Sequence, residues 1–317
     1  MNKIDQYLQE ALKRNASDLH FVSGDPVRAR IHGELQVMME DKLPVEAVQE
    51  AMMEIMDGVT QRTFEKEESA DFAYEIEGVS RFRANAFRHL NGIGGIFRAI
   101  PSTALTLDQL SMPPVIYDLC KQNSGMILVT GKTGSGKSTT LAAMIDAINT
   151  SAKGHILTIE DPIEFVHKTK SSLISQREIG LHSGSFAEAL HSALREDPDV
   201  ILVGEMRDLE TISIAVTAAE MGILVMGTLH TNGAGQTVDR IINSFPPDKQ
   251  AHIRTMISTS LRGVVSQQLL PTKGKPGRLA ALEVLINTSA VANLVRQGKL
   301  DQLETAMQSG GNVGMQT

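Results

Sequence analysis

A short glycine-rich stretch, GKTGSGKST at residues 131–139, constrains the fold of this chain more than any other feature. It follows the apolar run 126–129 and precedes the pattern KSTTLAAMIDAIN, so it joins a predicted strand to a predicted helix. Its glycines let the backbone curl so that successive N–H groups point inward, and the helix adds the N–H groups of its first turn. The pattern G-x-x-x-x-G-K-[ST] in this setting predicts a loop that cradles phosphate groups.

The predicted phosphate-binding residues form one continuous loop, in which two side chains have separate roles. Lys137 is expected to reach the β- and γ-phosphates of a nucleotide, and the Ser138 hydroxyl is expected to coordinate Mg²⁺. The guanine-specificity signature N/T-K-x-D does not occur anywhere after the loop, and its one match, residues 2–5, lies more than a hundred residues before it; this favours ATP. The whole predicted set is Gly131, Lys132, Thr133, Gly134, Ser135, Gly136, Lys137, Ser138 and Thr139.

Beyond residue 114 the sequence alternates short apolar runs with helical patterns; the apolar runs include GMILVTG, HILTIED, DVILVGE and ILVMGTLH. Such strands, separated by amphipathic helices, predict an α/β domain over residues 115–317 with a parallel sheet covered on both faces. The tail from Lys249 onward is expected to be mainly helical, with an apolar stripe of Ile253, Met256, Ile257, Leu261, Val264 and Val265.

Residues 1–100 show a different pattern, which predicts a small α+β domain. The segment 101–114, rich in Pro, Ser and Thr, is expected to be the linker between the two domains. Two alternating runs, DFAYEIEG and SRFRANAFRHLNGIGGIFRAI, read as strands, with Asn91-Gly92 as a hairpin turn in the second.

Several arginines stand out in this predicted hairpin. Arg81, Arg83 and Asn85 share one strand face, and Arg98 lies on the returning strand. By pattern alone, this face is either an ordinary solvated surface or a functional one.

Polar residues follow three of the apolar runs at the point where each predicted strand ends. Glu160, Asp161 and Glu164 follow the second run, Glu205 follows the third, and His230 ends the fourth. In open parallel sheets, catalytic groups gather at the carboxyl ends of the strands. We therefore expect one of the carboxylates after the second run to polarise the water that attacks the γ-phosphate, and His230 to belong to a sensor of that phosphate. Acids that only end a strand in solvent, and a structural histidine, are the alternatives.

The bulk composition narrows the class of protein. The formal charge of −7 argues against a nucleic-acid-binding surface, and the single cysteine, Cys120, excludes an internal disulfide. Neither a signal peptide nor an apolar stretch of the roughly 20 residues needed to span a bilayer is visible. We expect a cytoplasmic protein whose membrane contacts go through a partner.

Four segments in order resemble the secretion ATPase superfamily of type II secretion and type IV pili: GMILVTGKTGSGKSTT, ILTIEDPIEFVH, ALREDPDVILVGEMRDLETISIAVTAAEMGILVMGTLHTNGA and INSFPPDKQ. Within this superfamily the chain is most similar to the pilus retraction ATPases. The resemblance implies a RecA-like ATPase core preceded by a PAS-like N-terminal domain. The family's Walker A, Asp box, Walker B and His box correspond to residues 131–139, 157–167, 197–205 and about 222–230.

The resemblance also implies roles for the side chains. The family's Walker B motif ends in glutamate instead of aspartate, and Glu205 matches it. We expect Glu205 to hold Mg²⁺ through a water, while Glu164 orients or activates the attacking water. Family members form homohexamers, which makes three residues candidate arginine fingers toward a neighbouring subunit: Arg81, Arg83 and Arg98. Arg240 and Arg278 are further candidates for subunit contacts.

By this resemblance the chain is expected to be a motor that hydrolyses ATP to power type IV pilus retraction, and thereby pilin disassembly and twitching motility. Its expected partners are a platform protein of the inner membrane and an accessory retraction ATPase. The segment AVANLVRQ, residues 290–297, departs from the AIRNLIRE of retraction ATPases at Ala292 and Gln297.

Three alternative functions remain open at this point. One is a catalytically weak regulator or partner subunit of the true motor, which the intact set Lys137, Glu164, Glu205 and His230 argues against. Pilus assembly and type II secretion ATPases usually carry an extra N-terminal domain and a four-cysteine zinc site, whereas this chain has one cysteine. A RecA-like nucleic-acid motor needs a basic channel with stacking aromatic residues, whereas this chain is acidic and has no tryptophan.

The arginine face provides a first test. Arg83→Ala is expected to reduce ATP turnover by about 10³–10⁵-fold, the contribution of arginine fingers elsewhere, without loss of nucleotide binding. Steady-state phosphate release and nucleotide titration measure the two effects separately. Turnover equal to that of the wild type would remove Arg83 from the site.

Overall fold

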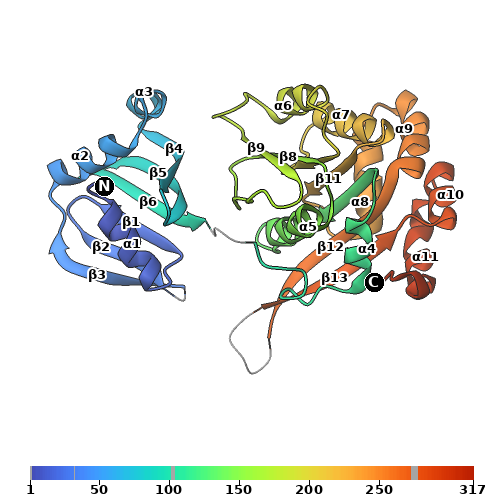
Figure 1. Ribbon diagram of the computed structural model, residues 1–317, viewed down its shortest axis with the longest axis horizontal. Coiled ribbons are helices and arrows are strands. Elements are labelled where there is room, and N and C mark those ends of the chain that lie inside the picture. The colour runs from blue at the N-terminus through green and yellow to red at the C-terminus, as the bar shows by residue number, and fades with distance from the viewer. Residues whose placement is uncertain (1, 32, 101–103, 273–277) are drawn as a thin grey trace. The chain divides into compact units, whose positions relative to one another are not determined.

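The computed structural model describes residues 2–31, 33–100, 104–272 and 278–317. The chain divides into two compact units, Met1–Ser102 and Thr103–Thr317, and each has its own hydrophobic core (Figure 1). Within the described ranges, no helix combines the length and the apolar character needed to cross a membrane.

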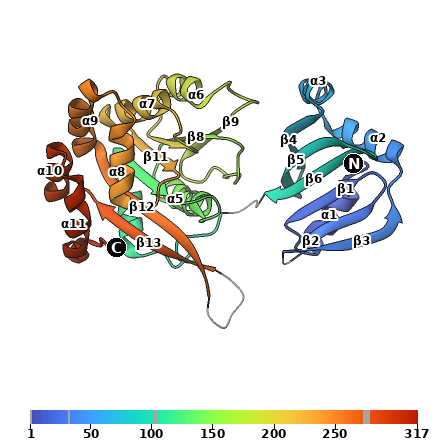
Figure 2. The same ribbon diagram turned by 180° about the vertical axis from the view of Figure 1, so that it is seen from behind.

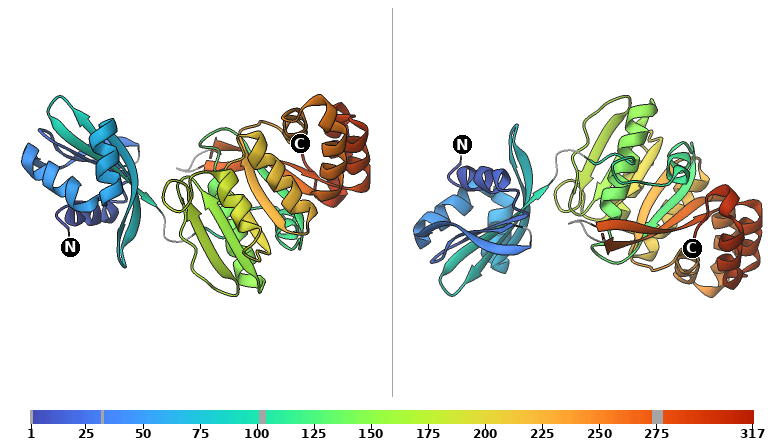
Figure 3. Two further views of the ribbon diagram at one scale, coloured as in Figure 1. Left: turned by 90° about the horizontal axis from the view of Figure 1, so that it is seen from above. Right: turned by 90° about the horizontal axis from the view of Figure 1, so that it is seen from below.

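The first unit is an antiparallel sheet with helices packed on one of its faces (Figure 3). The sheet has six strands in the order β3-β2-β1-β6-β5-β4. Its elements in chain order are α1 (Asp5–Lys13), β1 (Asp18–Val22), β2 (Pro26–Ile31), β3 (Glu34–Lys42), α2 (Val45–Ile55), α3 (Gly58–Glu67), β4 (Ser69–Ile76), β5 (Ser80–His89) and β6 (Gly92–Ile100).

The predicted hairpin is present in this unit with its turn one residue earlier than Asn91-Gly92, and the predicted alternation around its arginines is confirmed. Strand β5 pairs with β6 from His89↔Gly92 onward, so the turn lies at residues 90–91. Along β5, Phe82, Ala84 and Ala86 are buried, while Arg83 between them is exposed. Period-two alternation therefore assigns the apolar side chains to the core and the arginines to the opposite face.

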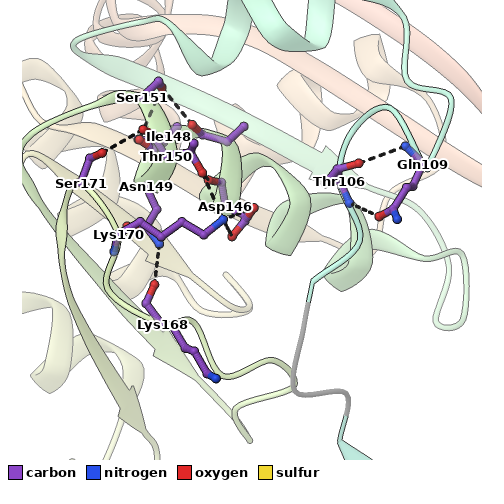
Figure 4. Close-up of polar contacts among 11 residues, drawn as sticks. Thr106, Gln109, Asp146, Ile148, Asn149, Thr150, Ser151, Lys168, Lys170 and Ser171 are labelled. Carbon is purple, nitrogen blue, oxygen red and sulfur yellow. Dashed lines mark hydrogen bonds and ion pairs between the residues drawn. The ribbon is translucent and has the colours of Figure 1, made fainter.

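The segment expected to be a linker is partly packed. Its residues 101–103 lie outside the described part of the chain. In the remainder, Thr106 and Gln109 each donate a backbone N–H to the other's side-chain oxygen, at 2.8 and 3.2 Å, and close a turn (Figure 4). Leu107 and Met112 are buried in a core of the second unit. This part of the segment therefore belongs structurally to the second unit.

The second unit is the expected α/β domain. Its sheet has seven strands in the order β13-β12-β7-β11-β10-β8-β9, all pairs parallel except β12 with β13 (Figure 2). The elements are α4 (Pro114–Cys120), β7 (Gly125–Thr130), α5 (Lys137–Ser151), β8 (His155–Glu160), β9 (Leu173–Glu178), α6 (Phe186–Ala193), β10 (Val200–Val203), α7 (Leu209–Glu220), β11 (Leu224–Leu229), α8 (Ala234–Asn243), α9 (Pro247–Ser260), β12 (Leu261–Pro271), β13 (Arg278–Ile286), α10 (Ser289–Gln297), η1 (Leu300–Gln302), α11 (Leu303–Ser309) and η2 (Gly311–Val313).

Helices cover both faces of this sheet, as the fully apolar strands predict. Alternate residues of β7 illustrate the division. Ile127 and Val129 pack in one core with residues of α4 and α5, whereas Met126 and Leu128 pack in another with residues of α6, α7, α8 and α9. The central strands are consequently buried on both sides.

The expectation of a mainly helical tail is wrong for Leu261–Pro271 and Arg278–Ile286, which are strands, whereas α9, α10 and α11 are helical as expected. Helix α9 ends at Ser260, and the chain continues as β12 beside β7 and then as β13. Short apolar runs fit a buried strand as well as a helix, so periodicity alone could not distinguish them. The β-branched pair Val264 and Val265, both fully buried, favours the strand.

The core of the first unit depends on large buried side chains of its central strands. Phe97 of β6 is 1% exposed, so Phe97→Ala should reduce the free energy of unfolding by about 3–5 kcal/mol. Leu90 in the neighbouring turn is 99% exposed, and Leu90→Ala should change it by less than about 0.5 kcal/mol. Denaturant unfolding of the two variants checks this. Equal effects would contradict the burial assigned to Phe97.

Candidate functional site

The predicted site residues of the second unit come together because four parallel strands end at one edge of the sheet. Strand β7 pairs with β11, β11 with β10, and β10 with β8. Parallel pairing puts the carboxyl ends of all four on the same side. The glycine-rich loop follows β7, His230 follows β11, and Glu205 lies after β10. Glu160 is the last residue of β8, and Glu164 lies in the loop that follows it.

The glycine-rich loop adopts the conformation that its sequence predicts. Gly131, Gly134 and Gly136 have φ values of 139°, 80° and 87°, which side chains with a Cβ rarely adopt. The Nζ of Lys137 lies inside the loop and donates to the carbonyl oxygens of Gly131 at 2.9 Å and Lys132 at 3.2 Å. The buried ammonium therefore helps to close the loop around itself.

The charge of Lys137 is balanced by carboxylates from two other loops. Burial lowers the pKa of Lys137, while the negative charges of Glu205 and Glu164 oppose this shift. Both carboxylates thus lie within electrostatic range of the ammonium. The structure brings together three residues that the sequence places on three separate strand ends.

Glu205 is held by two cationic or potentially cationic side chains. Its Oε1 accepts from Arg207 Nε at 2.5 Å and lies 2.8 Å from His230 Nε2. Burial acts to raise the pKa of Glu205, but the hydrogen bond to Arg207 and the charges of His230 and Arg207 outweigh it and lower the pKa. Glu205 therefore stays ionised, as a ligand of a metal shell must.

Glu164 is exposed, but the turn that carries it is held by the half-buried Glu160 and the buried Glu178. Glu160 accepts the backbone N–H of Glu164 at 3.3 Å, and Glu178 accepts that of Ile163 at 3.1 Å. Burial raises the pKa of Glu160, against hydrogen bonds from Thr158 and Gln176 that lower it. Of the two glutamates, Glu160 is therefore a support, and Glu164 is the one available to a substrate.

The far end of the same loop is tied to α5, the helix that follows the phosphate-binding loop (Figure 4). Asn149 donates to the carbonyl oxygen of Lys168 at 2.8 Å and accepts the N–H of Lys170 at 3.1 Å. The ammonium of Lys170 also pairs with Asp146 at 2.8 Å. Glu164 and the phosphate-binding loop thus share one scaffold.

The donor set fits a nucleotide with Mg²⁺, not a metal held by protein groups alone. In the part of the chain that the structure describes, no cluster of three or more His, Cys, Asp or Glu side chains is arranged to bind a metal ion. Mg²⁺ is usually held by one or two protein groups and by substrate phosphates, with water completing the shell. Ser138 in the first turn of α5 and Glu205 would supply the protein side of such a shell.

The predicted arginine fingers lie in the first unit, apart in sequence from these loops. Arg83 faces Arg98 directly across β5 and β6. Like charges placed opposite each other repel, and a nearby carboxylate offsets this for each arginine. Asp71 lies 4.0 Å from Arg83, and Asp18 pairs with Arg98 at 2.8 Å. Arg81 lies two residues before Arg83 on the same strand, and its role, like theirs, stays a prediction. Arg240 on α8 and Arg278 at the start of β13 are exposed.

Two residues of the site were missed in the sequence. Arg207 lies two residues after Glu205, and its exposed position in a loop gave no pattern to detect. Gln267 is buried against the phosphate-binding loop. The polar pair Gln267-Gln268 inside an apolar run could have indicated this residue. The helical interpretation of the run concealed it.

Comparison with known proteins places the chain among bacterial secretion and pilus proteins. A family described as type II/IV secretion system protein matches residues 1–311. The type IV pilus retractation ATPase PilT of Pseudomonas aeruginosa is 49% identical over 314 residues, covering 99% of this chain and 91% of PilT. A twitching motility protein of Neisseria gonorrhoeae is 51% identical over 288 residues, covering 91% of this chain and 77% of that protein.

A solved structure agrees with these relatives. The crystal structure of the pilus retraction motor PilT with bound ADP superposes with a TM-score of 0.92 at 44% identity. The match covers 98% of this chain and 90% of the PilT chain.

Isosteric substitution can distinguish the expected roles of Glu164 and Glu205. Glu164→Gln should reduce phosphate release by about 10²–10⁴-fold at saturating Mg²⁺, because the amide cannot accept a proton from water. Glu205→Gln should instead raise the Mg²⁺ concentration needed for half-maximal turnover. Titrating Mg²⁺ in a phosphate-release assay separates the two, with Glu210→Gln on the exposed start of α7 as the control. The reverse pattern would assign the base to Glu205.

Proposed function

The chain belongs to the type II/IV secretion system protein family, and we propose that it is the motor ATPase of type IV pilus retraction. The observation that carries the proposal is the convergence of Lys137, Glu164, Glu205 and His230 at one sheet edge. The chain that contains this site is 49% identical to a pilus retractation ATPase over 99% of its length.

Binding of ATP begins at the phosphate-binding loop. The loop N–H groups and the first turn of α5 receive the phosphates. The Nζ of Lys137 then exchanges its carbonyl partners, Gly131 and Lys132, for oxygens of the β- and γ-phosphates. Ser138 and Glu205 would hold Mg²⁺, which would supply charge neutralisation at the same phosphates.

Hydrolysis then depends on the neighbouring strand ends. Glu164, on a turn held by Glu160 and Glu178, orients and activates the attacking water. His230, whose Nε2 lies 2.8 Å from Glu205 Oε1, senses the γ-phosphate through this contact. The site thus has a means to distinguish ATP from ADP.

The motor acts as a homohexamer, in which the arginine face of the first unit serves a neighbour's nucleotide. The exposed Arg83 and Arg98 support this assignment. The motor acts on a platform protein of the inner membrane, and an accessory retraction ATPase assists it. Pilus assembly and type II secretion are the alternative functions, and they are disfavoured because the retractation ATPase PilT is 49% identical, whereas a type II secretion ATPase and a pilus assembly ATPase are 34% and 33% identical.

Loss of one ammonium group tests the proposal. Lys137→Ala should lower ATP turnover by on the order of 10²–10³-fold, because a preorganised charge at the phosphates is removed. Lys153→Ala, an exposed lysine just beyond the end of the same helix, is the control and should retain activity.

The direction of the motor needs a cellular measurement. In a strain defective in pilus retraction, the wild-type chain and Lys153→Ala should restore twitching, and Lys137→Ala should not. An active ATPase that never restores twitching would contradict retraction while leaving the ATPase assignment intact.

A further inference from the structure

Gln267 of β12 holds the phosphate-binding loop from the side with both ends of its amide. The side chain is 2% exposed. Its Nε2 donates to the backbone carbonyl of Ser135 at 2.7 Å, and its Oε1 accepts from the Thr140 hydroxyl at 2.7 Å. One partner lies in the loop before Lys137 and the other lies in α5 after it. The amide therefore spans the segment that receives the phosphates.

The backbone of the loop also packs directly on Gln267. A Cβ added to Gly131 would lie 2.3 Å from the carbonyl oxygen of Gln267, and one added to Gly136 would lie 2.8 Å from its Nε2. Both distances are too short for a side chain. Glycine at these two positions therefore serves contact with β12 as well as the positive φ of the loop.

The position of Gln267 follows from the register of β12. The last pair between β12 and β7 is Ser266↔Thr130, so Gln267 stands level with the start of the loop. Ser266, which points to the other face, accepts the N–H of Gly233 at 2.9 Å. Gly233 lies three residues after His230. Two consecutive residues of β12 thus hold the two loops that face the nucleotide.

We propose that Gln267 is a positioning residue that holds the phosphate-binding loop in its phosphate-receiving conformation before the nucleotide arrives. A glycine-rich loop loses much conformational freedom when it becomes ordered, and a clamp that orders it in advance strengthens binding. The proposal rests on the proposed function, because it assigns Gln267 to the binding of the same nucleotide.

Variants that keep the shape but remove hydrogen bonds provide the test. Gln267→Met removes both bonds at similar volume, and Gln268→Met is the matched control at the exposed neighbour. Thr140→Val removes only the hydrogen bond to Oε1 of Gln267, whereas Thr140→Ser keeps a hydroxyl that can donate it. The threonine pair keeps the test decisive if Gln267→Met does not fold.

The readouts are the Kd for Mg²⁺-ADP by calorimetry, KM and kcat for ATP hydrolysis, and the Tm of each variant. We expect Gln267→Met to raise Kd and KM by roughly 5- to 100-fold, the effect of a buried partner left unsatisfied. Thr140→Val should raise them less, and Thr140→Ser and Gln268→Met should match the wild type.

Two outcomes would overturn the inference. One is a lower Tm with Kd and KM within about twofold of wild type at a temperature where all variants are folded, since Gln267 would then be structural only. The other is a lower kcat with unchanged Kd. A wild-type chain that binds no Mg²⁺-ADP and hydrolyses no ATP would instead contradict the proposed function itself.

Discussion

The parallel pairing of β7, β11, β10 and β8 is the interaction on which the rest of the site depends. It brings four strand ends to one edge, and each end is followed by a loop that leaves the sheet there. A buried ammonium, two carboxylates and an imidazole are thereby concentrated in one place, although they come from distant parts of the chain. No single loop could hold such a set of charges in a fixed geometry.

Buried and half-buried glutamates organise these loops by accepting backbone N–H groups. Glu160 and Glu178 hold the turn of Glu164, and Glu283 of β13 accepts the N–H of Ala234 at the start of α8. Hydrogen bonds to a charged acceptor are stronger than those between neutral groups. A carboxylate that would be costly when isolated thus becomes a rigid support. Some of the chain's acidic residues therefore serve to hold loops rather than to charge the surface.

Strand β12 lies between β7, which leads into the phosphate-binding loop, and β13, the last strand of the sheet. Its side chains at Ser266 and Gln267 reach two different loops because successive residues of a strand point to opposite faces. On the other side of the hairpin, β13 contributes Glu283 to the same region. The segment that the sequence made look like a helical tail is therefore part of the nucleotide-binding scaffold.

The sequence alone determined the phosphate-binding loop, the apolar strands and the alternation of β5, since each depends on residues close together in the chain. Backbone curvature at Gly131, Gly134 and Gly136, and the period-two pattern around Arg83, are local properties. Only the tertiary structure decided that Glu205 pairs with His230 and that Gln267 reaches Ser135. These contacts depend on which strands become neighbours, and that order is set by packing across the whole sheet, which no local pattern encodes.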